Sequence, residues 1–222
     1  MLYIVSTPIG NLKDITLRAI EVLKSVDLIA AEDTRHTGIL CKEYGITAPL
    51  TSYFDHNESG KARELVNLLK SGKNIALVSD AGTPGINDPG YRLVSLAKAE
   101  GVPMAVIPGA CAVIAALSLS ALPTDRFAFY GFLPVKPGAR RKKIEEAAKA
   151  GGTAIFYESP HRILKALKDI EEVLSDPQVT VARELTKKFE ERLDGKASEL
   201  HAHFTKHKPL GEFVVLFHVE RE

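Results

Sequence analysis

A carboxylate, an imidazole and a guanidinium occur close together in residues 156–162, FYESPHR. Glu158 ends an apolar run that is typical of a buried strand, and His161 and Arg162 follow it. A carboxylate or an imidazole can accept a proton from a reacting hydroxyl, and a guanidinium can orient a phosphate or carboxylate. Pro160 also begins a helix well, so helix initiation explains part of the pattern. The segment indicates a polar active site at a strand end, beside this simpler explanation.

A second polar group lies where an expected strand meets an expected helix, in residues 30–38, AAEDTRHTG. Its charged or titratable members are Glu32, Asp33, Arg35 and His36. Asp33 could simply cap the helix, and Arg35 could simply pair with an acid. Both a catalytic and a structural interpretation therefore stay open for this segment.

Three loops follow expected strands and are rich in glycine, proline or small residues: STPIGN (6–11), SDAGTPGINDPG (79–90) and PGACA (108–112). Ligands of open parallel sheets bind beyond the carboxyl ends of the strands, where these loops lie. The first loop lacks the GxGxxG pattern of dinucleotide binding and could be an ordinary turn. The second is long for a plain connection, and its glycines would let backbone amides and carbonyls face an adenosine. The small residues of the third could instead serve helix–sheet packing.

A basic stretch, KPGARRKK, covers residues 136–143 and carries five positive charges without an acid. It could be the solvated start of a helix. Cations at a helix N-terminus oppose the helix dipole, and this mild penalty favours a functional reason such as contact with phosphate. We therefore expect the following side chains to hold the phosphate groups of a ligand, which would be RNA phosphates if the partner is RNA: Lys136, Arg140, Arg141, Lys142 and Lys143, with Arg162 beside them.

The elements that position these groups alternate along the first half of the chain. Apolar runs predict strands in residues 2–7, 28–33, 51–54, 75–80 and 103–107. Helical periodicity predicts helices from Asp14, which we expect to cap its first turn, and over 34–44, 58–71 and about 90–100. A small-residue helix is expected after PGACA. Alternating strands and helices predict a mainly parallel sheet that is covered on both faces.

The second half has a different pattern. Strands are predicted in residues 127–132, 153–159, 180–185 and 211–219, with helices from about Gly138 and over 161–174. We therefore predict an α/β protein of two domains: residues 1–119, a linker over 120–126, and residues 127–222 with a mixed sheet.

Composition excludes several classes of protein. Hydrophobic residues make up 45% and charged residues 26% of the 222 residues, as in globular proteins. The formal net charge is +1, so any RNA must bind to a local patch. Cys41 and Cys111 form no CxxC pair and belong to no zinc-ligand pattern, so no metal is expected. Without a signal peptide or an apolar run of about 20 residues, we expect a cytoplasmic protein that does not contact the membrane.

Six motifs in order resemble those of a known family. VSTPIGNLKDIT, AAEDTRHTG, SDAGTPGINDPG, PGACA, FYESPHR and VARELTK cover nearly the whole chain. Together they are similar to the ribosomal RNA small subunit methyltransferase I family, a branch of the tetrapyrrole methylase superfamily. Six ordered motifs are far more specific than any one alone.

The resemblance implies an S-adenosylmethionine-dependent enzyme, usually a homodimer, whose cofactor lies in a cleft between two α/β domains. It implies 2′-O-methylation of a cytidine in 16S ribosomal RNA, within the 30S subunit. The tetrapyrrole branch often has an acid where this chain has Thr83. By analogy with the superfamily, the cofactor would be bound by Pro8, Gly10, Gly82, Thr83, Pro84, Ile86, Ala110, Cys111 and Ala112.

Transfer of an activated methyl group needs alignment above all, and a ribose hydroxyl gains from a nearby base. Our candidates for this base are Glu158, Asp33 and His161, in that order, and Arg35 and Arg162 would orient phosphate or carboxylate groups. Two alternatives remain open. One is a methylase of a small anionic substrate such as a tetrapyrrole, which would not need the basic stretch. The other is a non-catalytic RNA-binding assembly factor, which a test of S-adenosylmethionine binding would distinguish from both enzymes.

Overall fold

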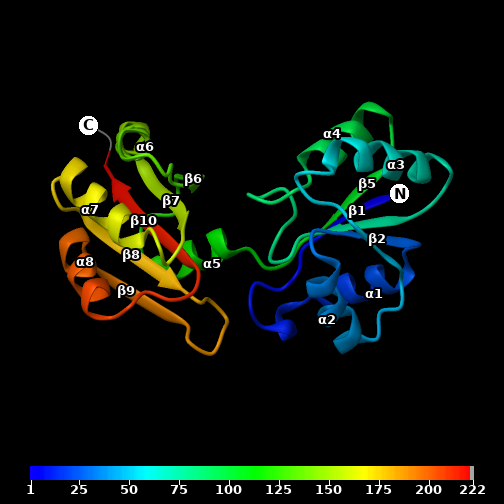
Figure 1. Cartoon of the computed structure of the whole chain (residues 1–222), viewed down its shortest axis with the longest axis horizontal. Coiled ribbons are helices and arrows are strands. Elements are labelled where there is room, and N and C mark those ends of the chain that lie inside the picture. The colour runs from blue at the N-terminus through cyan, green and yellow to red at the C-terminus, as the bar shows by residue number, and fades with distance from the viewer. Residues whose placement is uncertain (221–222) are drawn as a thin grey trace. The chain divides into compact units, whose positions relative to one another are not determined.

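The computed structural model describes residues 1–220, which fall into two compact units that divide between Cys111 and Ala112 (Figure 1). We had expected the first domain to extend to residue 119. The helix α5 (Ala112–Ser120) instead groups with the second unit, because it packs on β8, β9 and β10 there. The expected linker, residues 120–126, is also tied to the second sheet, since Thr153 Oγ1 donates to the carbonyl oxygen of Pro123.

The first unit contains a five-stranded sheet in which every pair of neighbours is parallel, as the alternating pattern predicts. The order is β3-β2-β4-β1-β5. The strands are β1 (Leu2–Val5), β2 (Leu28–Ala31), β3 (Leu50–Ser52), β4 (Ile75–Val78) and β5 (Met104–Ile107). The carboxyl ends of β4, β1 and β5 are therefore adjacent, which brings together the three loops singled out in the sequence.

Helices cover both faces of this sheet. Leu23 and Leu40 bury one face with α1 and α2, and Leu65 and Leu93 bury the other with α3 and α4. The helices are α1 (Leu17–Ser25), α2 (Thr34–Tyr44), α3 (Glu58–Lys70) and α4 (Tyr91–Ala99). Burial of both faces is the reason that these strands are short continuous apolar runs.

The first helix begins later than expected. Residues Leu12–Asp14 form a short 3-10 helix, η1, capped by Asn11, and α1 begins only at Leu17. The cap of α1 is Thr16, whose side chain accepts a hydrogen bond from the backbone of Ala19. The prediction that Asp14 caps this helix was wrong, because Asp14 ends η1 and Thr16, also a favoured capping residue, directly precedes α1.

The second unit contains a mixed sheet in the order β6-β7-β10-β8-β9. Only β6 and β7 run parallel, and the other three pairs are antiparallel. The strands are β6 (Phe127–Phe132), β7 (Gly152–Glu158), β8 (Gln178–Arg183), β9 (Glu191–Lys196) and β10 (Phe213–Val219). The mixed sheet agrees with the prediction for this half of the chain.

Three helices cover one face of the second sheet, and α5 covers the other. The three are α6 (Pro137–Ala150), α7 (Ile163–Val173) and α8 (Ala197–Lys206). The sequence analysis missed β9 and α8. The strand β9, ERLDGK, lies at the sheet edge with every second residue exposed, so its charged residues hid the pattern.

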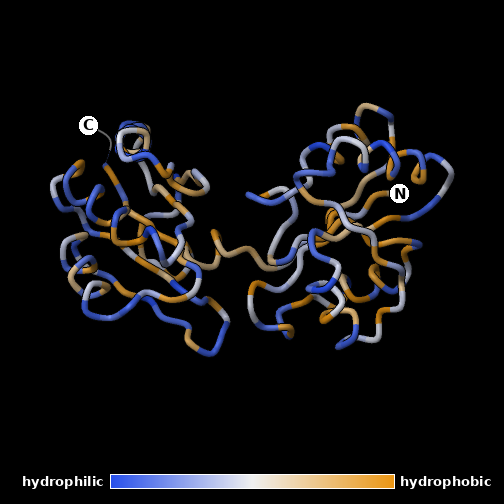
Figure 2. Tube along the Cα trace, viewed as in Figure 1, coloured by the Kyte–Doolittle hydropathy of each residue, from blue (hydrophilic) through white to orange (hydrophobic). Residues whose placement is uncertain are grey.

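The hydropathy of the chain follows this layering. In Figure 2 the strand traces within each unit are mainly hydrophobic, and hydrophilic segments lie along the outer helices and loops. Within residues 1–220, every helix is too short or too polar to cross a bilayer.

Candidate functional site

The three glycine- and proline-rich loops meet at the carboxyl end of the first sheet. The backbone of Thr7 and Gly82 exchanges two hydrogen bonds, of 2.9 and 3.1 Å, which join the first loop to the second. The hydroxyls of Ser6 and Thr83 lie 2.9 Å apart, and Thr83 Oγ1 donates to the carbonyl oxygen of Ala110 at 3.3 Å, which adds the third loop. We call this arrangement the loop cradle.

Two glycines allow the loops of the loop cradle to pack closely against one another. Gly82 has a φ of +85°, a backbone conformation that residues with a side chain rarely adopt. A Cβ there would lie 3.4 Å from a side-chain carbon of Ile9. A Cβ at Gly109 would come within 3.0 Å of the Cβ of Ser6. Bare backbone and small hydroxyl side chains therefore form this surface, a chemistry that suits close approach by a flat, uncharged ring with hydrogen-bonding edges.

The predicted cofactor residues divide between the centre of the loop cradle and its surroundings. Gly82 and Thr83 make the bonds that join the loops, and Ala110 provides the carbonyl oxygen that Thr83 binds. The others lie along the same three loops: Pro8 and Pro84 are buried, Cys111 is half-buried, Gly10 and Ile86 are exposed, and Ala112 begins α5.

Beside the loop cradle, acids from two neighbouring strand ends crowd together, a feature that the sequence analysis missed. The backbone of Asp33 donates to Asp80 at 3.0 Å, and the backbone of Asp80 donates to Glu32 at 3.3 Å. Burial, with the nearby charges of Glu32 and Asp80, raises the pKa of Asp88 to about 7. Burial also raises the pKa of Glu32. The available signal was topological, since these residues follow β2 and β4, which are neighbours in a parallel sheet.

Glu158 ends β7 as a buried carboxylate, and only one of its two oxygens accepts hydrogen bonds within residues 1–220. Its Oε1 accepts hydrogen bonds from the backbone of Ser159 at 2.9 Å and from Arg162 Nε at 2.8 Å. Its Oε2 is buried and has no hydrogen-bond partner within residues 1–220. Burial raises the pKa of Glu158, and the contacts with Ser159 and Arg162 oppose that effect. Such a carboxylate can accept a proton on the free oxygen while the other oxygen is held in place.

Of the other residues predicted near Glu158, the structure brings Arg162 to it and leaves His161 apart. Arg162 Nη2 lies 2.7 Å from Glu158 Oε1, and its guanidinium stacks 5.5 Å from the ring centre of Phe132. His161 is exposed, and no hydrogen bond joins it to Glu158 in the described part of the chain. The sequence proximity of His161 arises from the loop between β7 and α7.

Asp33 and Arg35 form an exposed pair of a different kind. Asp33 caps α2 by accepting from the backbone of Arg35 at 2.8 Å. Both carboxylate oxygens also accept from the guanidinium of Arg35, whose side chain is 89% exposed. These bonds hold the pKa of Asp33 well below its usual range. The structural interpretation of this segment, a cap with an ion pair, accounts for the contacts of the Asp33 carboxylate.

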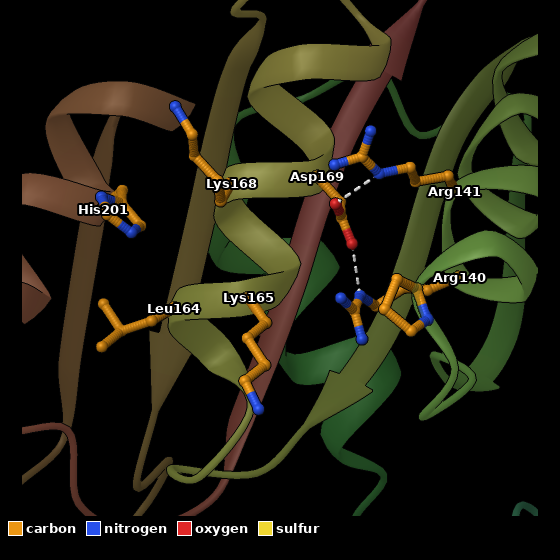
Figure 3. A pocket seen from close by; sticks show the side chains of 8 residues that line it. Arg140, Arg141, Leu164, Lys165, Lys168, Asp169 and His201 are labelled. Carbon is orange, nitrogen blue, oxygen red and sulfur yellow. Dashed lines mark hydrogen bonds and ion pairs between the residues drawn. The ribbon is translucent and has the colours of Figure 1, made fainter.

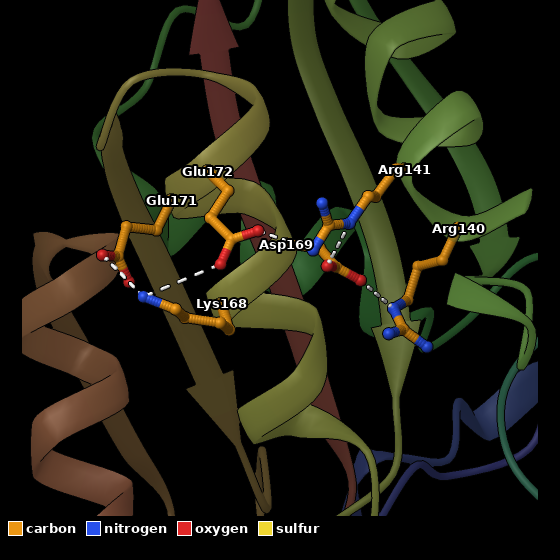
Figure 4. Close-up of polar contacts among 6 residues, drawn as sticks. All are labelled: Arg140, Arg141, Lys168, Asp169, Glu171 and Glu172. Carbon is orange, nitrogen blue, oxygen red and sulfur yellow. Dashed lines mark hydrogen bonds and ion pairs between the residues drawn. The ribbon is translucent and has the colours of Figure 1, made fainter. Parts of the chain in front are cut away.

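The basic stretch contains two arginines that bind acids of a neighbouring helix (Figure 4). Arg140 is buried, and its Nε donates to Asp169 at 2.6 Å. Arg141 Nε donates to the other oxygen of Asp169 at 2.8 Å, and its Nη2 donates to Glu172. We had expected both arginines to hold RNA phosphates. The structure shows that acids of another helix already bind them, because α7 places Asp169 and Glu172 opposite α6, which the local sequence does not reveal.

The lysines of the basic stretch are more accessible. Lys136 and Lys142 are exposed, and neither forms an ion pair within residues 1–220. Lys143 is half-buried, lies over the ring of Tyr130 at 5.1 Å, and is 3.7 Å from Glu146. Lys136 and Lys142 therefore leave their full charge available to a ligand. Within residues 1–220, no group of His, Cys, Asp and Glu has an arrangement that could hold a metal ion.

Comparisons with known proteins agree with this architecture. Residues 1–201 match the family described as Tetrapyrrole (Corrin/Porphyrin) Methylases. Ribosomal RNA small subunit methyltransferase I of Vibrio cholerae serotype O1 is 52% identical over 225 residues, which cover 100% of this chain and 78% of that protein. The protein of the same name from Thermotoga maritima is 46% identical over 97% of this chain and 96% of its own length. The X-ray structure of a cobalamin biosynthetic enzyme, cobalt precorrin-4 methyltransferase, has a TM-score of 0.70 at 19% identity and covers 97% of this chain and 94% of that one, a likeness of fold alone.

Proposed function

The chain belongs to the ribosomal RNA small subunit methyltransferase I family of the tetrapyrrole methylases, and from this membership we propose that it methylates the ribose of a cytidine in 16S ribosomal RNA. It is a methyltransferase that uses S-adenosylmethionine, and its substrate is ribosomal RNA. The 2′-hydroxyl as acceptor, the 30S subunit as the form of the substrate, a homodimeric assembly and a cytoplasmic location are parts of the proposal.

The observation that carries the proposal is the loop cradle. Three loops from adjacent parallel strands converge where open α/β sheets bind their ligands, and their contact surface is backbone and hydroxyl. Backbone amides and carbonyls can recognise the edge of an adenine without charged side chains. We propose that Gly82, Thr83 and Ala110 contact the cofactor directly, with Pro8, Gly10, Pro84, Ile86, Cys111 and Ala112 shaping the surrounding loops.

S-adenosylmethionine supplies a methyl group on a sulfonium, which is already activated for transfer. The residues of the chain then have two tasks, alignment of the acceptor and removal of its proton. The loop cradle serves alignment, because the bonds among Ser6, Thr83 and Ala110 fix the three loops against one another.

We assign proton removal to Glu158. Its Oε2 is free to accept a proton, and burial raises the pKa of the carboxyl, which makes the carboxylate a stronger base than an exposed one. Arg162 holds Oε1 and thereby fixes the direction of Oε2. Asp33 is a poorer candidate, because Arg35 occupies both of its oxygens and lowers its pKa.

One experiment tests this function. Purified 30S subunits that lack the modification are incubated with the protein and with S-adenosylmethionine labelled in the methyl group, and the RNA is then digested to nucleosides. We expect label in 2′-O-methylcytidine. Label on a base or in another nucleoside would contradict the proposed acceptor, and the absence of label from both 30S subunits and naked 16S RNA would contradict the proposed function.

The same reaction separates the two alternatives. A methylase of a tetrapyrrole would label the tetrapyrrole and leave the RNA unlabelled. A non-catalytic assembly factor would bind 30S subunits without binding S-adenosylmethionine, which calorimetry measures directly. The level of sequence identity favours the RNA methylase, because the RNA methyltransferase relatives are near 50% identical and the tetrapyrrole enzyme shares only 19%.

A further inference from the structure

The outer helices of the second unit line an open hollow that the proposed function does not use. It has a volume of about 390 Å³ and lies among the side chains of α6, α7 and α8 (Figure 3). We call it the helix hollow. Its polar lining consists of Arg140, Arg141, Lys165, Lys168, Asp169 and His201, and Pro137 and Leu164 complete it.

The charges of the helix hollow are mostly positive. Four cations and one acid line it, which leaves a formal excess of three positive charges with His201 neutral. At its edge, Glu171 lies 3.1 Å from Lys168, and Glu172 binds Arg141 and lies 3.9 Å from Lys168. Lys165 is exposed and has neither an ion pair nor a hydrogen bond within the described residues, so its full charge is available.

The arginines of the helix hollow are fixed but not saturated. Arg140 is buried, and its Nε and Nη1 donate to Asp169 and to the carbonyl oxygen of Val135. Arg141 uses Nε and Nη2. One terminal nitrogen of each guanidinium thus has no hydrogen-bond partner among residues 1–220. Figure 3 shows the guanidinium of Arg140 and the ammonium of Lys165 toward the same end of the hollow.

Fixed guanidinium groups with free N–H bonds, next to an unpaired ammonium, recognise phosphate oxygens. Asp169 does not oppose such a ligand strongly, because two arginines already neutralise it. We propose that the helix hollow binds a phosphodiester of the RNA backbone, with Lys165 as its principal free cation. This inference rests on the proposed function and adds to it a binding site for the substrate.

The position of the helix hollow supports a role in RNA binding. Lys165 lies in the first turn of α7, three residues after Arg162, which pairs with Glu158. Three residues of an α-helix span about 4.5 Å along its axis. The field of Arg140 also reaches Glu158, where it lowers the pKa of the carboxyl. A phosphate in the helix hollow would therefore lie near the polar cluster that contains Glu158.

The test compares Lys165→Glu with Lys149→Glu in the full chain. Both variants reverse one exposed lysine, but Lys149 lies in the last turn of α6 and does not line the helix hollow. The first readout is binding of a fluorescent single-stranded fragment of 16S RNA at several salt concentrations. The second is methylation of 30S subunits that lack the modification, and the third is affinity for S-adenosylmethionine.

We expect Lys165→Glu to weaken RNA binding and to reduce the salt slope by about 1, the value for one lost phosphate contact. The KM for 30S subunits should rise severalfold, with kcat and cofactor affinity unchanged, and Lys149→Glu should match the parent protein in every readout. If the parent protein methylates RNA and Lys165→Glu leaves RNA binding and KM unchanged, the proposed phosphate site is wrong and the proposed function stands. A parent that binds RNA but methylates none would overturn the proposed function, and the loss of binding in Lys165→Glu would still support the hollow.

The source of the phosphate is tested with inorganic phosphate as the probe, measured by chemical shifts of the backbone amides of α7. We expect weak binding that RNA displaces. If Lys165→Glu abolished phosphate binding and left RNA binding unchanged, the helix hollow would be a site for free phosphate, and the proposal would be wrong.

Discussion

The loop cradle of the first unit and the buried ion pairs of the second are built on different physical principles. The loop cradle is held by backbone and hydroxyl hydrogen bonds, and a glycine at φ +85° lies at its centre. The second unit buries full charges, Glu158 with Arg162 and Asp169 with Arg140. We therefore expect the loop cradle to be sensitive to changes in side-chain size, and the buried ion pairs to be sensitive to changes in charge. Substitutions that change only size or only charge test this difference.

The largest effect should follow from removal of the charge of Asp169. Asp169→Asn keeps the shape but leaves Arg140 buried without a counter-ion, and breaking a buried pair on one side costs about 3 kcal/mol or more. Urea unfolding measures this loss of stability. Glu172→Gln, a matched charge removal at a half-exposed position, should cost far less. If Asp169→Asn lost less than about 1 kcal/mol, buried charge would not hold α6 to α7.

The next largest effect is expected for Glu158→Gln, which removes the proposed base without changing its size. The rate of the chemical step should fall about a hundredfold, equal to about 2.7 kcal/mol of barrier. Single-turnover methylation with both substrates saturating measures it, and cofactor affinity should be retained. Asp33→Asn is the control and should transfer methyl at close to the parent rate. If Asp33→Asn lost activity and Glu158→Gln kept it, the assignment of the base would be reversed.

A change of size alone should impair the loop cradle. Gly82→Val places a branched side chain against Ile9 in a conformation that side chains rarely adopt. The added side chain would fill space that the proposed cofactor needs, so affinity for S-adenosylmethionine should fall about tenfold or more in calorimetry on the folded variant, equal to about 1.4 kcal/mol or more of binding free energy. Gly72→Val shares the backbone strain, with a φ of +93°, but its Cβ meets no atom within 4 Å. Equal losses of affinity in the two variants would remove the loop cradle from the cofactor site.

Asp88 is a residue of the first unit whose charge should affect folding stability. Its expected effect is the smallest of these predictions. The pKa of Asp88 in the folded protein, about 7, exceeds its ordinary value of 3.8, so the folded state binds the proton more tightly. Folding stability contributed by this group therefore falls as pH rises from about 4 to 7. Asp88→Asn should remove this loss and gain about 1 kcal/mol at pH 8, a figure reduced for solvent screening, with little gain at pH 4. Urea unfolding at the two pH values measures it, and an equal gain at both would exclude the charge as the cause.

Much of the first unit could be predicted from the sequence because its signals are local. Short apolar runs separated by amphipathic helices predict a parallel sheet, and loops such as residues 79–90 are visible as glycine and proline clusters. The parallel topology then places the loops at one edge. Glu158 at the end of β7 was also predictable, since its strand is a continuous apolar run.

The charged contacts could not be predicted in the same way because their partners are distant in the chain. Asp169 neutralises Arg140 across 29 residues, and Asp80 contacts Asp33 across 47. The pattern of the basic stretch shows only where positive charge occurs, not whether an acid faces it. Lys165 escaped attention for the converse reason, since nothing in its own helix distinguishes it until residues of α6 and α8 line the helix hollow beside it.

The position of β10 in the second sheet has a consequence for the order in which the enzyme is assembled during synthesis. Phe213–Val219 is inserted between β7 and β8, so β7 gains its second neighbour only after residues 213–219 have been synthesised. The sheet of the first unit needs no residue beyond Ile107. Domains made first tend to fold first. The unit that contains the loop cradle can therefore be complete while Glu158, whose strand neighbour β10 is made later, still awaits its final position.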